Sequence, residues 1–410
     1  MTQRIIRNYL IFSVIFGFGL SFTFGSYTLF LRSLGLSLFE INLVNFIYMG
    51  SGFLLEVLTG ALADMFGRKK SVILGCAIMA TGFVFYSHAV GFRSAVLAEV
   101  TIALGSAFIS GAMGALAFDA LKHYGYTDNF RHVSRRRLKA ELLAKIAGPL
   151  AASAVVGPDL SRMWLFAAAG CACAGVFCLM SFSEPYFKSG EKKSFALLTR
   201  IMRQGVGEAI NNRAVLLVIG FGVIFSVVIQ ALNMYWPIVF RDDFSFTARQ
   251  INIAMALIQA AILCGNQLSE LVVARFKNER HALILPQLVT ATGMVVAASG
   301  AGFYPVILGF FAHEMSRGVF EPVKEGYIHH RVRDDGKRAT IVSFQKMMSS
   351  LGMALGLIGS GAIAGHYSIK ASWLLSGLIM LGAVPLFLNI KNGEESVKLT
   401  EPEFVAADEE

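Results

Sequence analysis

Residues 60–70 read Gly60-Ala-Leu-Ala-Asp-Met-Phe-Gly-Arg-Lys-Lys70 and separate two long apolar stretches, about 37–63 and about 71–92. Each stretch is long enough to cross the roughly 30 Å hydrocarbon core of a bilayer as a helix that rises ~1.5 Å per residue. The charged segment is therefore predicted to be a tight turn between two membrane-spanning helices.

The composition of the whole chain agrees with a membrane protein. Of its 410 residues, 55% are hydrophobic and 15% are charged, whereas soluble domains carry about 25% charged residues. The 36 Lys and Arg residues, which give a net charge of +9, gather in short clusters between apolar stretches. This pattern is typical of cytoplasmic loops and excludes soluble enzymes and nucleic-acid binders.

Twelve apolar spans are predicted, with boundaries near 9–31, 37–63, 71–92, 94–121, 138–160, 162–182, 213–240, 247–273, 281–301, 303–330, 339–366 and 369–390. The amino-terminal tail and every second loop hold 26 Lys and Arg residues, and the opposite loops hold 6. Because loops rich in Lys and Arg stay in the cytoplasm, both termini are expected there. The chain contains no Asn-x-Ser/Thr sequon, which favours the bacterial inner membrane.

The spans fall into two halves of six. The longest break, residues 183–212, is predicted to be a cytoplasmic linker between an N-terminal bundle, residues 1–182, and a C-terminal bundle, residues 213–390. The acidic residues 391–410 are expected to be a disordered cytoplasmic tail. The two halves resemble each other weakly at an offset of about 200 to 210 residues, which is typical of transporters that rock one half against the other.

The quoted segment closely resembles the signature G-x-x-x-D-[RK]-x-G-[RK]-[RK] of the major facilitator superfamily, with Met65 where a basic residue is usual. It lies between the second and third spans, as it does in that family. Gly148-Pro149 in the fifth span resembles a degraded form of the family's antiporter motif. Arg317-Gly-Val-Phe-Glu-Pro322 resembles the second half of drug-exporter-like bacterial members.

This resemblance implies an all-α membrane protein with twelve transmembrane helices in two pseudo-symmetric six-helix bundles. It also implies that spans 1, 4, 7 and 10 line a central cavity, that spans 2, 5, 8 and 11 join the halves, and that the others face lipid. Four residues of the signature are expected to form a cytoplasmic gate: Gly60, Asp64, Gly67 and Arg68. In the family, the aspartate holds the cytoplasmic side shut by meeting a helix terminus and an arginine.

Span 10 carries the most charge. Glu314, Arg317 and Glu321 share one helical face, and His313 adjoins them. A membrane-embedded charge is costly unless it is paired or hydrated, so each one suggests a function. We expect Glu314 to take up and release a coupling proton while Arg317 adjusts its acidity or contacts substrate. The alternative is an ion-pair ladder that only supports packing.

Further polar groups lie in other predicted cavity-lining spans. In span 4, Glu99 is either a second proton site or a hydrated acid at the interface, and Asp119 is expected to pair with the basic loop at its own helix end. Gln230 and Asn233 lie in span 7 among aromatic residues. A cavity with aromatic walls and few polar groups suits an amphiphilic organic molecule better than a sugar.

Four charges lie at matching depths in the spans that should join the halves. Glu56 and Lys346 each lie eight residues, about 12 Å, from the cytoplasmic end of their spans. Lys145 and Glu270 likewise lie at matching depths in their spans. We predict that Glu56 pairs with Lys346 and that Lys145 pairs with Glu270 when the cytoplasmic side is closed. The alternative is that each charge is satisfied within its own half or reaches water.

Taken together, the sequence predicts a secondary active transporter, most simply a proton-coupled exporter of small amphiphilic compounds that works as a monomer in the bilayer. It is not expected to be an enzyme or to hold a cofactor or metal. The alternatives are an importer or facilitator of an organic anion, with Arg317 as counter-ion, or a membrane-embedded receptor or enzyme. Five cysteines are predicted to be buried free thiols: Cys76, Cys171, Cys173, Cys178 and Cys264.

Overall fold

The computed structural model describes residues 1–126, 130–157, 159–185, 207, 213–276, 279–300, 302–331 and 335–389. Most of the predicted linker and the whole acidic tail lie outside these ranges. The side chains of Glu56 and Asp64 also lie outside those that the structure describes, although both residues belong to a helix.

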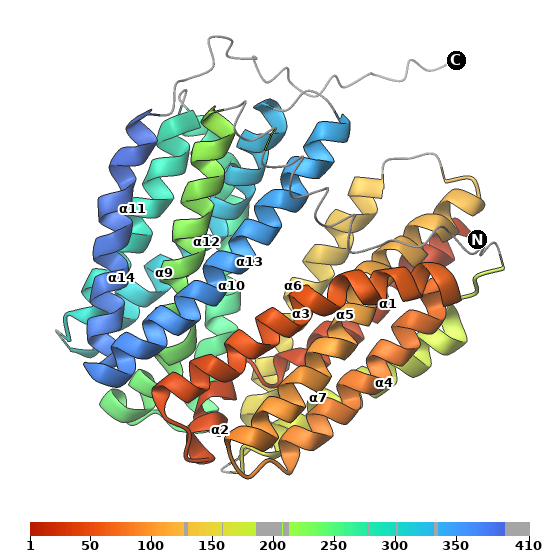
Figure 1. The fold of residues 1–410 in the computed structure, drawn as a ribbon, viewed down its shortest axis with the longest axis horizontal. Coiled ribbons are helices and arrows are strands. Elements are labelled where there is room, and N and C mark those ends of the chain that lie inside the picture. The colour runs from red at the N-terminus through yellow and green to blue at the C-terminus, as the bar shows by residue number, and fades with distance from the viewer. Residues whose placement is uncertain are drawn as a thin grey trace.

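The described residues form helices and no strands, which confirms the predicted all-α class. The first group of helices comprises α1 (Thr2–Ser21), α2 (Tyr27–Ser33), α3 (Leu38–Phe66), α4 (Arg68–Ser87), α5 (Phe92–His123), α6 (Phe130–Val155) and α7 (Arg162–Ser181). The second comprises α9 (Arg213–Phe244), α10 (Ala248–Arg275), α11 (Glu279–Ala298), α12 (Phe303–Arg331), α13 (Asp335–His366), α14 (Ile369–Ala383) and the 3-10 helix η1 (Val384–Asn389). Figure 1 shows them as two bundles side by side.

Nine of the described helices are long and apolar enough to cross a membrane. Three others, α3, α6 and α12, are equally long at 26 to 29 residues. Both α6 and α12 carry several charged residues, some of which form the ion pairs described below. The twelve predicted spans are thus all present as helices, two of them in two pieces.

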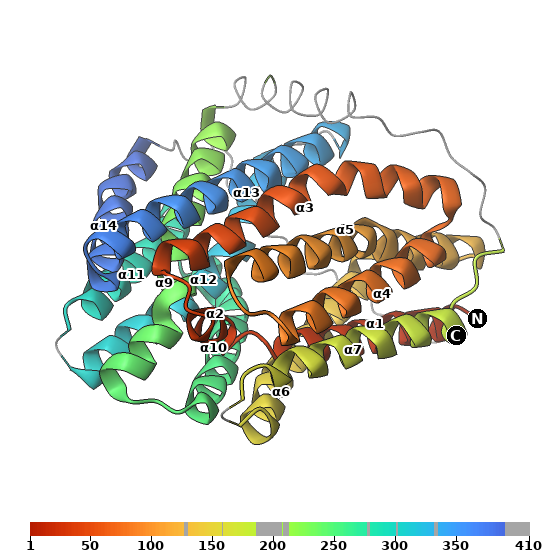
Figure 2. The same cartoon turned by 60° about the horizontal axis from the view of Figure 1, so that its bottom comes forward.

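Packing within and between the bundles follows the expected layout. In the first bundle α4 packs on α5 and α7, and α1 packs on α6; in the second, α12 packs on α10 and α11, and α13 packs on α9. Between the bundles α3 packs on α13 and α6 packs on α10, and Figure 2 shows α3 and α13 lying side by side. These are spans 2 with 11 and 5 with 8, so the predicted contact helices are confirmed.

The bundles meet at the end of the molecule where α2 lies and diverge toward the other end (Figure 1). At the α2 end, the Arg32 guanidinium lies 3.3 Å from the Asp242 carboxylate across the two halves. The Asn42 amide donates to the Leu357 carbonyl at 2.8 Å and to the Ser360 hydroxyl at 2.9 Å. This is the end predicted to face outside, so the conformation is open toward the predicted cytoplasmic side.

The first span is not the continuous helix that we predicted for residues 9–31. Helix α1 ends at Ser21, and α2 begins only at Tyr27. The hydroxyls of Ser21 and Thr23 donate to backbone carbonyls three residues earlier, and such local bonds compete with a continuing helix. Gly25 lies so close to α10 that a Cβ there would be 2.6 Å from the Asn252 side-chain oxygen.

All five cysteines are free, but only three of them are buried. Cys76, Cys171 and Cys178 face the interior, whereas Cys173 and Cys264 are exposed on the outer surface of their helices. The prediction that all five are buried was wrong for these two, because a helix with 3.6 residues per turn directs Cys173 away from the face that buries Cys171 and Cys178.

Candidate functional site

The centre of the candidate site is an ion pair on α12 that reaches across to α9. Glu314 is only 2% exposed, and its carboxylate accepts a hydrogen bond of 3.3 Å from Nη1 of Arg317. The same nitrogen donates to the side-chain oxygen of Asn233 on α9 at 2.9 Å. Three residues singled out from the sequence therefore lie together. Gln230 lies one turn from Asn233, and its amide donates to the Ser226 carbonyl at 3.3 Å instead.

Small residues fix α12 in this position. Gly318 lies against Ile262 and Gly265 of α10, where an added Cβ would come within 2.3 Å of the Ile262 carbonyl oxygen. Gly309 lies equally close to Gly293 of α11. Because small residues let helix backbones approach closely in a membrane, two sides of α12 are occupied. The Arg317 side chain lies on a third side, toward α9, and is 32% exposed.

His313 lies one turn before Arg317 on α12 and packs against α11. It is completely buried, and its backbone and Cβ lie next to Gly293 of α11. Its Nε2 atom is 4.0 Å from the Glu314 carboxylate, and neither ring nitrogen has a hydrogen-bond partner among the residues that the structure describes. His313 is therefore a buried neighbour of the Glu314 carboxylate.

A second ion pair lies two turns further along α12, and sequence reasoning missed half of it. Lys324 is 3% exposed, and its ammonium donates to both oxygens of Glu321 at 2.8 and 2.7 Å. It also lies 5.3 Å from the centre of the Phe320 ring. The sequence did contain a sign of this pair. Glu314 and Arg317 are three residues apart, and the same spacing of acid to base recurs seven residues later at Glu321 and Lys324.

Glu99 is held by hydroxyl groups in the first bundle. It is 6% exposed, and its carboxylate accepts hydrogen bonds from Tyr27 of α2 at 3.3 Å and from Tyr86 of α4. The Tyr86 ring stacks on Trp164 with centroids 4.0 Å apart. The alternative that Glu99 is a hydrated acid at the interface is therefore wrong, because its side chain is buried and bonded to two tyrosine hydroxyls. No sequence spacing indicated these tyrosine partners.

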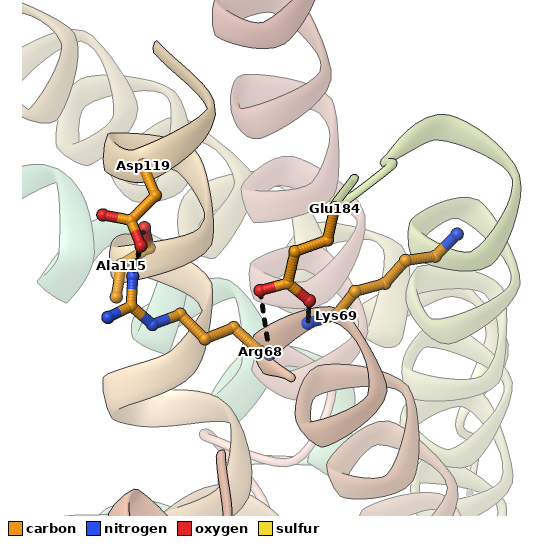
Figure 3. A network of polar contacts seen from close by, with 5 residues as sticks. All are labelled: Arg68, Lys69, Ala115, Asp119 and Glu184. Carbon is orange, nitrogen blue, oxygen red and sulfur yellow. Dashed lines mark hydrogen bonds and ion pairs between the residues drawn. The ribbon is translucent and has the colours of Figure 1, made fainter. Parts of the chain in front are cut away.

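The signature turn joins three helices of the first bundle (Figure 3). Gly67 has a φ of 101°, a conformation that favours glycine, and α4 begins directly after it. The Arg68 side chain pairs with Asp119 of α5 and donates to the Ala115 carbonyl at 3.2 Å. Asp119 thus pairs with this turn and not with the loop at its own helix end.

Glu184 also belongs to this network, although the sequence did not point to it. Its two carboxylate oxygens accept from the backbone N–H groups of Arg68 at 3.1 Å and Lys69 at 3.0 Å. A carboxylate at the first turn satisfies unpaired N–H groups and is favoured by the helix dipole. The gate residue Gly60 lies in α3, and the side chain of Asp64 is outside the described part.

Of the two predicted pairs between the halves, Lys145 and Glu270 form no ion pair among the residues that the structure describes, and the Glu56 side chain lies outside them. Lys145 pairs with Glu141 one turn earlier on α6, at 2.7 Å, and Arg137 pairs with the same carboxylate. Glu270 and Lys346 are exposed. Since the bundles diverge at this end, the inter-half pairs concern the closed state and stay predictions. In the open state, Lys145 takes its partner from its own half.

Comparison with known proteins points to one family. The family model of the Major Facilitator Superfamily matches residues 222–407. Multidrug resistance protein MdtH of Aeromonas salmonicida and that of Aeromonas hydrophila are each 22% identical over 358 residues, which cover 84% of this chain and 84% of theirs.

Solved structures agree over the length of both bundles. The nucleoside transporter NupG superposes with a TM-score of 0.79 at 14% identity and covers 94% of this chain and 98% of its own. The human organic anion transporter MFSD10 gives a TM-score of 0.65 at 14% identity, with coverage of 94% and 99%. At these identities the likeness concerns the fold. The signature turn, the helix layout and these likenesses agree: the chain is a multi-pass membrane protein with the fold of major facilitator superfamily transporters, and the model of that family matches its second bundle.

Proposed function

We propose that this transporter is a proton-coupled exporter of small amphiphilic organic compounds and that Glu314 carries the coupling proton. The observation that supports this is the buried Glu314 carboxylate, which lies 3.3 Å from a guanidinium that also binds the neighbouring helix α9. The proposal includes the predicted setting: a monomer in the bacterial inner membrane with both termini in the cytoplasm.

The position of Glu314 and Arg317 along α12 supports a role in proton coupling. Helix α12 starts at the closed end, where Phe303 packs against Phe244 at the end of α9, and runs toward the open end. Arg317 therefore lies on the open side of Glu314. Protonation of Glu314 removes the charge that attracts Arg317, which frees the guanidinium to change its contacts with α9. A proton bound at one carboxylate can thus alter how two cavity-lining helices hold each other.

Export is supported by sequence likeness. The relatives that match over 84% of the chain are named multidrug resistance proteins, and the Gly148-Pro149 motif resembles that of antiporters. The cavity-lining helix α9 presents apolar and aromatic side chains with few polar ones, which suits amphiphilic compounds.

The test is transport in inverted vesicles with an imposed pH gradient, screened over compounds of several classes. Glu314→Gln should abolish transport driven by the gradient but allow exchange of substrate across the membrane. Glu325→Gln is the matched control, because Glu325 lies on the same helix and is exposed; it should keep both activities. Gradient-driven flux that is unchanged in Glu314→Gln would sink the proposal.

A further inference from the structure

The guanidinium of Arg317 is shared between two helices, and its two bonds differ in length. The Nη1 atom donates to the side-chain oxygen of Asn233 on α9 at 2.9 Å and to the Glu314 carboxylate at 3.3 Å. Hydrogen bonds between a charged donor and a charged acceptor are usually the shorter ones, at about 2.7–2.9 Å. Here the shorter bond goes to an uncharged amide. Asn233 therefore holds the guanidinium partly away from the carboxylate that attracts it.

The second ion pair on α12 shows what the same spacing gives without a third partner. Glu321 and Lys324 are also three residues apart, and among the described residues the Lys324 ammonium donates hydrogen bonds only to Glu321. It reaches both carboxylate oxygens, at 2.8 and 2.7 Å, whereas Arg317 reaches one oxygen of Glu314. The longer contact of Arg317 thus goes with its additional acceptor on α9.

Few other charged or titratable groups lie near Glu314. On its own helix, the Nε2 atom of His313 is 4.0 Å from the carboxylate. No Asp, Glu, Lys, Arg or His occurs in the central parts of the three helices that contact α12: residues 214–240 of α9, 250–269 of α10 and 282–298 of α11. Arg317 is therefore the cation that acts most directly on Glu314, and the position of its guanidinium decides how strongly it acts.

From these contacts we infer that Asn233 is a positioning residue that sets the acidity of Glu314 by dividing Arg317 between α9 and α12; its importance for transport rests on the proposed function of Glu314. A cation beside a carboxylate favours the charged form, and its effect grows as the two groups approach. By holding the guanidinium back, Asn233 leaves Glu314 able both to take up and to release a proton. An amide suits this role because it accepts a hydrogen bond without adding a charge.

Two substitutions of Asn233 should move the titration of Glu314 in opposite directions. Asn233→Leu removes the second acceptor, so Arg317 should bind Glu314 alone and the carboxyl group should lose its proton at a lower pH. Asn233→Asp adds a carboxylate that draws the guanidinium away, so Glu314 should keep its proton to a higher pH. Each shift should be roughly one pH unit, at the low end of what a nearby charge produces. His313 is unchanged in both variants and cannot account for a difference between them.

The titration can be followed by infrared spectroscopy of the full-length protein in lipid. Isotope-labelled glutamate separates the glutamate carboxyl bands from that of the introduced aspartate, and Glu314→Gln identifies the band of Glu314. Ser226→Ala is the matched control, because Ser226 lies two turns before Asn233 on the same helix and is also largely buried; the midpoint of Glu314 should then equal that of wild type. Unchanged midpoints in both Asn233 variants, or shifts in the same direction, would overturn the inference.

Transport measurements separate this inference from the proposed function. In inverted vesicles, the pH at which gradient-driven transport is half-maximal should shift in the same direction as the midpoint of Glu314 for each variant. If the midpoint shifts and the pH dependence of transport does not, Asn233 positions Arg317 as inferred, but Glu314 does not carry the coupling proton. If neither shifts, the role assigned to Asn233 is wrong, and the proposal for Glu314 is still decided by Glu314→Gln alone.

Discussion

Among the side chains that the structure describes, each half of the molecule buries one carboxylate, and the two are held by different chemistry. Glu314 in the second bundle accepts from the guanidinium of Arg317 at 3.3 Å, whereas Glu99 in the first accepts from the hydroxyls of Tyr27 and Tyr86. Neutralising a carboxylate removes its attraction to a cation, but a tyrosine hydroxyl donates to a charged or neutral carboxyl alike. Of these two buried carboxylates, Glu314 is therefore the one whose change of charge alters a contact.

Two further groups of charges also differ between the halves. On α12 the pair of Glu321 and Lys324 repeats the pair of Glu314 and Arg317 along a single helix. In the first bundle, Arg68 joins α4 to α5, and Glu184 joins the end of α7 to the start of α4. The network around Arg68 thus connects three helices and supports the bundle as a unit. Four substitutions test this contrast, in order of decreasing effect.

The largest effect is expected for Glu321→Gln, which leaves the buried Lys324 ammonium without its partner. The Glu321 side chain is 47% exposed but the Lys324 side chain is only 4% exposed, and a buried charge left without its partner is destabilising, so the thermal unfolding midpoint in detergent should fall. Replacing both partners, with Glu321→Gln and Lys324→Met, should recover much of the loss because no buried charge remains. A double variant as unstable as the single one would show that Lys324 is not stabilised by this pair.

The next effect concerns the predicted pair of Glu56 and Lys346. Glu56→Lys should impair transport, because two cations would then face each other when the cytoplasmic side closes, and like charges placed together at an interface cost several kcal/mol. Adding Lys346→Glu should restore part of the activity. Transport by the double exchange that is no better than by the worse single variant would contradict the pair. For Lys145 and Glu270 we expect a weaker effect, because Lys145 already pairs with Glu141.

A smaller effect is expected for Asp64→Asn in the signature turn. Loss of a carboxylate that holds the cytoplasmic side shut should favour the open conformation by about 1–3 kcal/mol, the usual range of coupling energies. Labelling of introduced cysteines on the cytoplasmic side should become faster than in a wild-type background. Equal labelling rates would show that Asp64 does not stabilise the closed state.

The smallest effect is expected for Glu184→Gln at the start of α4. The substitution keeps one oxygen acceptor but removes a charge near the helix dipole, which is worth ~0.3–1 kcal/mol. The unfolding midpoint should fall slightly, and the transport rate should stay near that of wild type. A loss of transport without a loss of stability would mean that this network changes during turnover, and the contrast between the halves would then fail.

Some of the site was predictable because its signal is local. The residues Glu314 and Arg317 are three apart on one helix, and this spacing places them together in any α-helix. The pair of Glu321 and Lys324 could have been predicted in the same way, because it has the same spacing. Asn233 was expected in the cavity because span 7 lines it in the resembled fold, but its bond to Arg317 depends on how α9 packs against α12.

The sequence by itself determined the twelve spans and their division into two halves. Hydropathy and loop charge suffice for this, because each span must satisfy its own backbone hydrogen bonds in the bilayer whatever its neighbours are. The signature turn added the family and hence the order in which the helices pack.

Only the tertiary structure decided which partner each charged group takes. Arg68 meets Asp119 and Glu184, which lie 51 and 116 residues away, and Tyr27 meets Glu99 at a separation of 72. The sequence likewise did not predict the break between α1 and α2, where α10 approaches Gly25 closely. Such contacts are fixed by the rotation and depth of whole helices against one another. A linear pattern of apolar and charged residues limits these two variables but does not determine them.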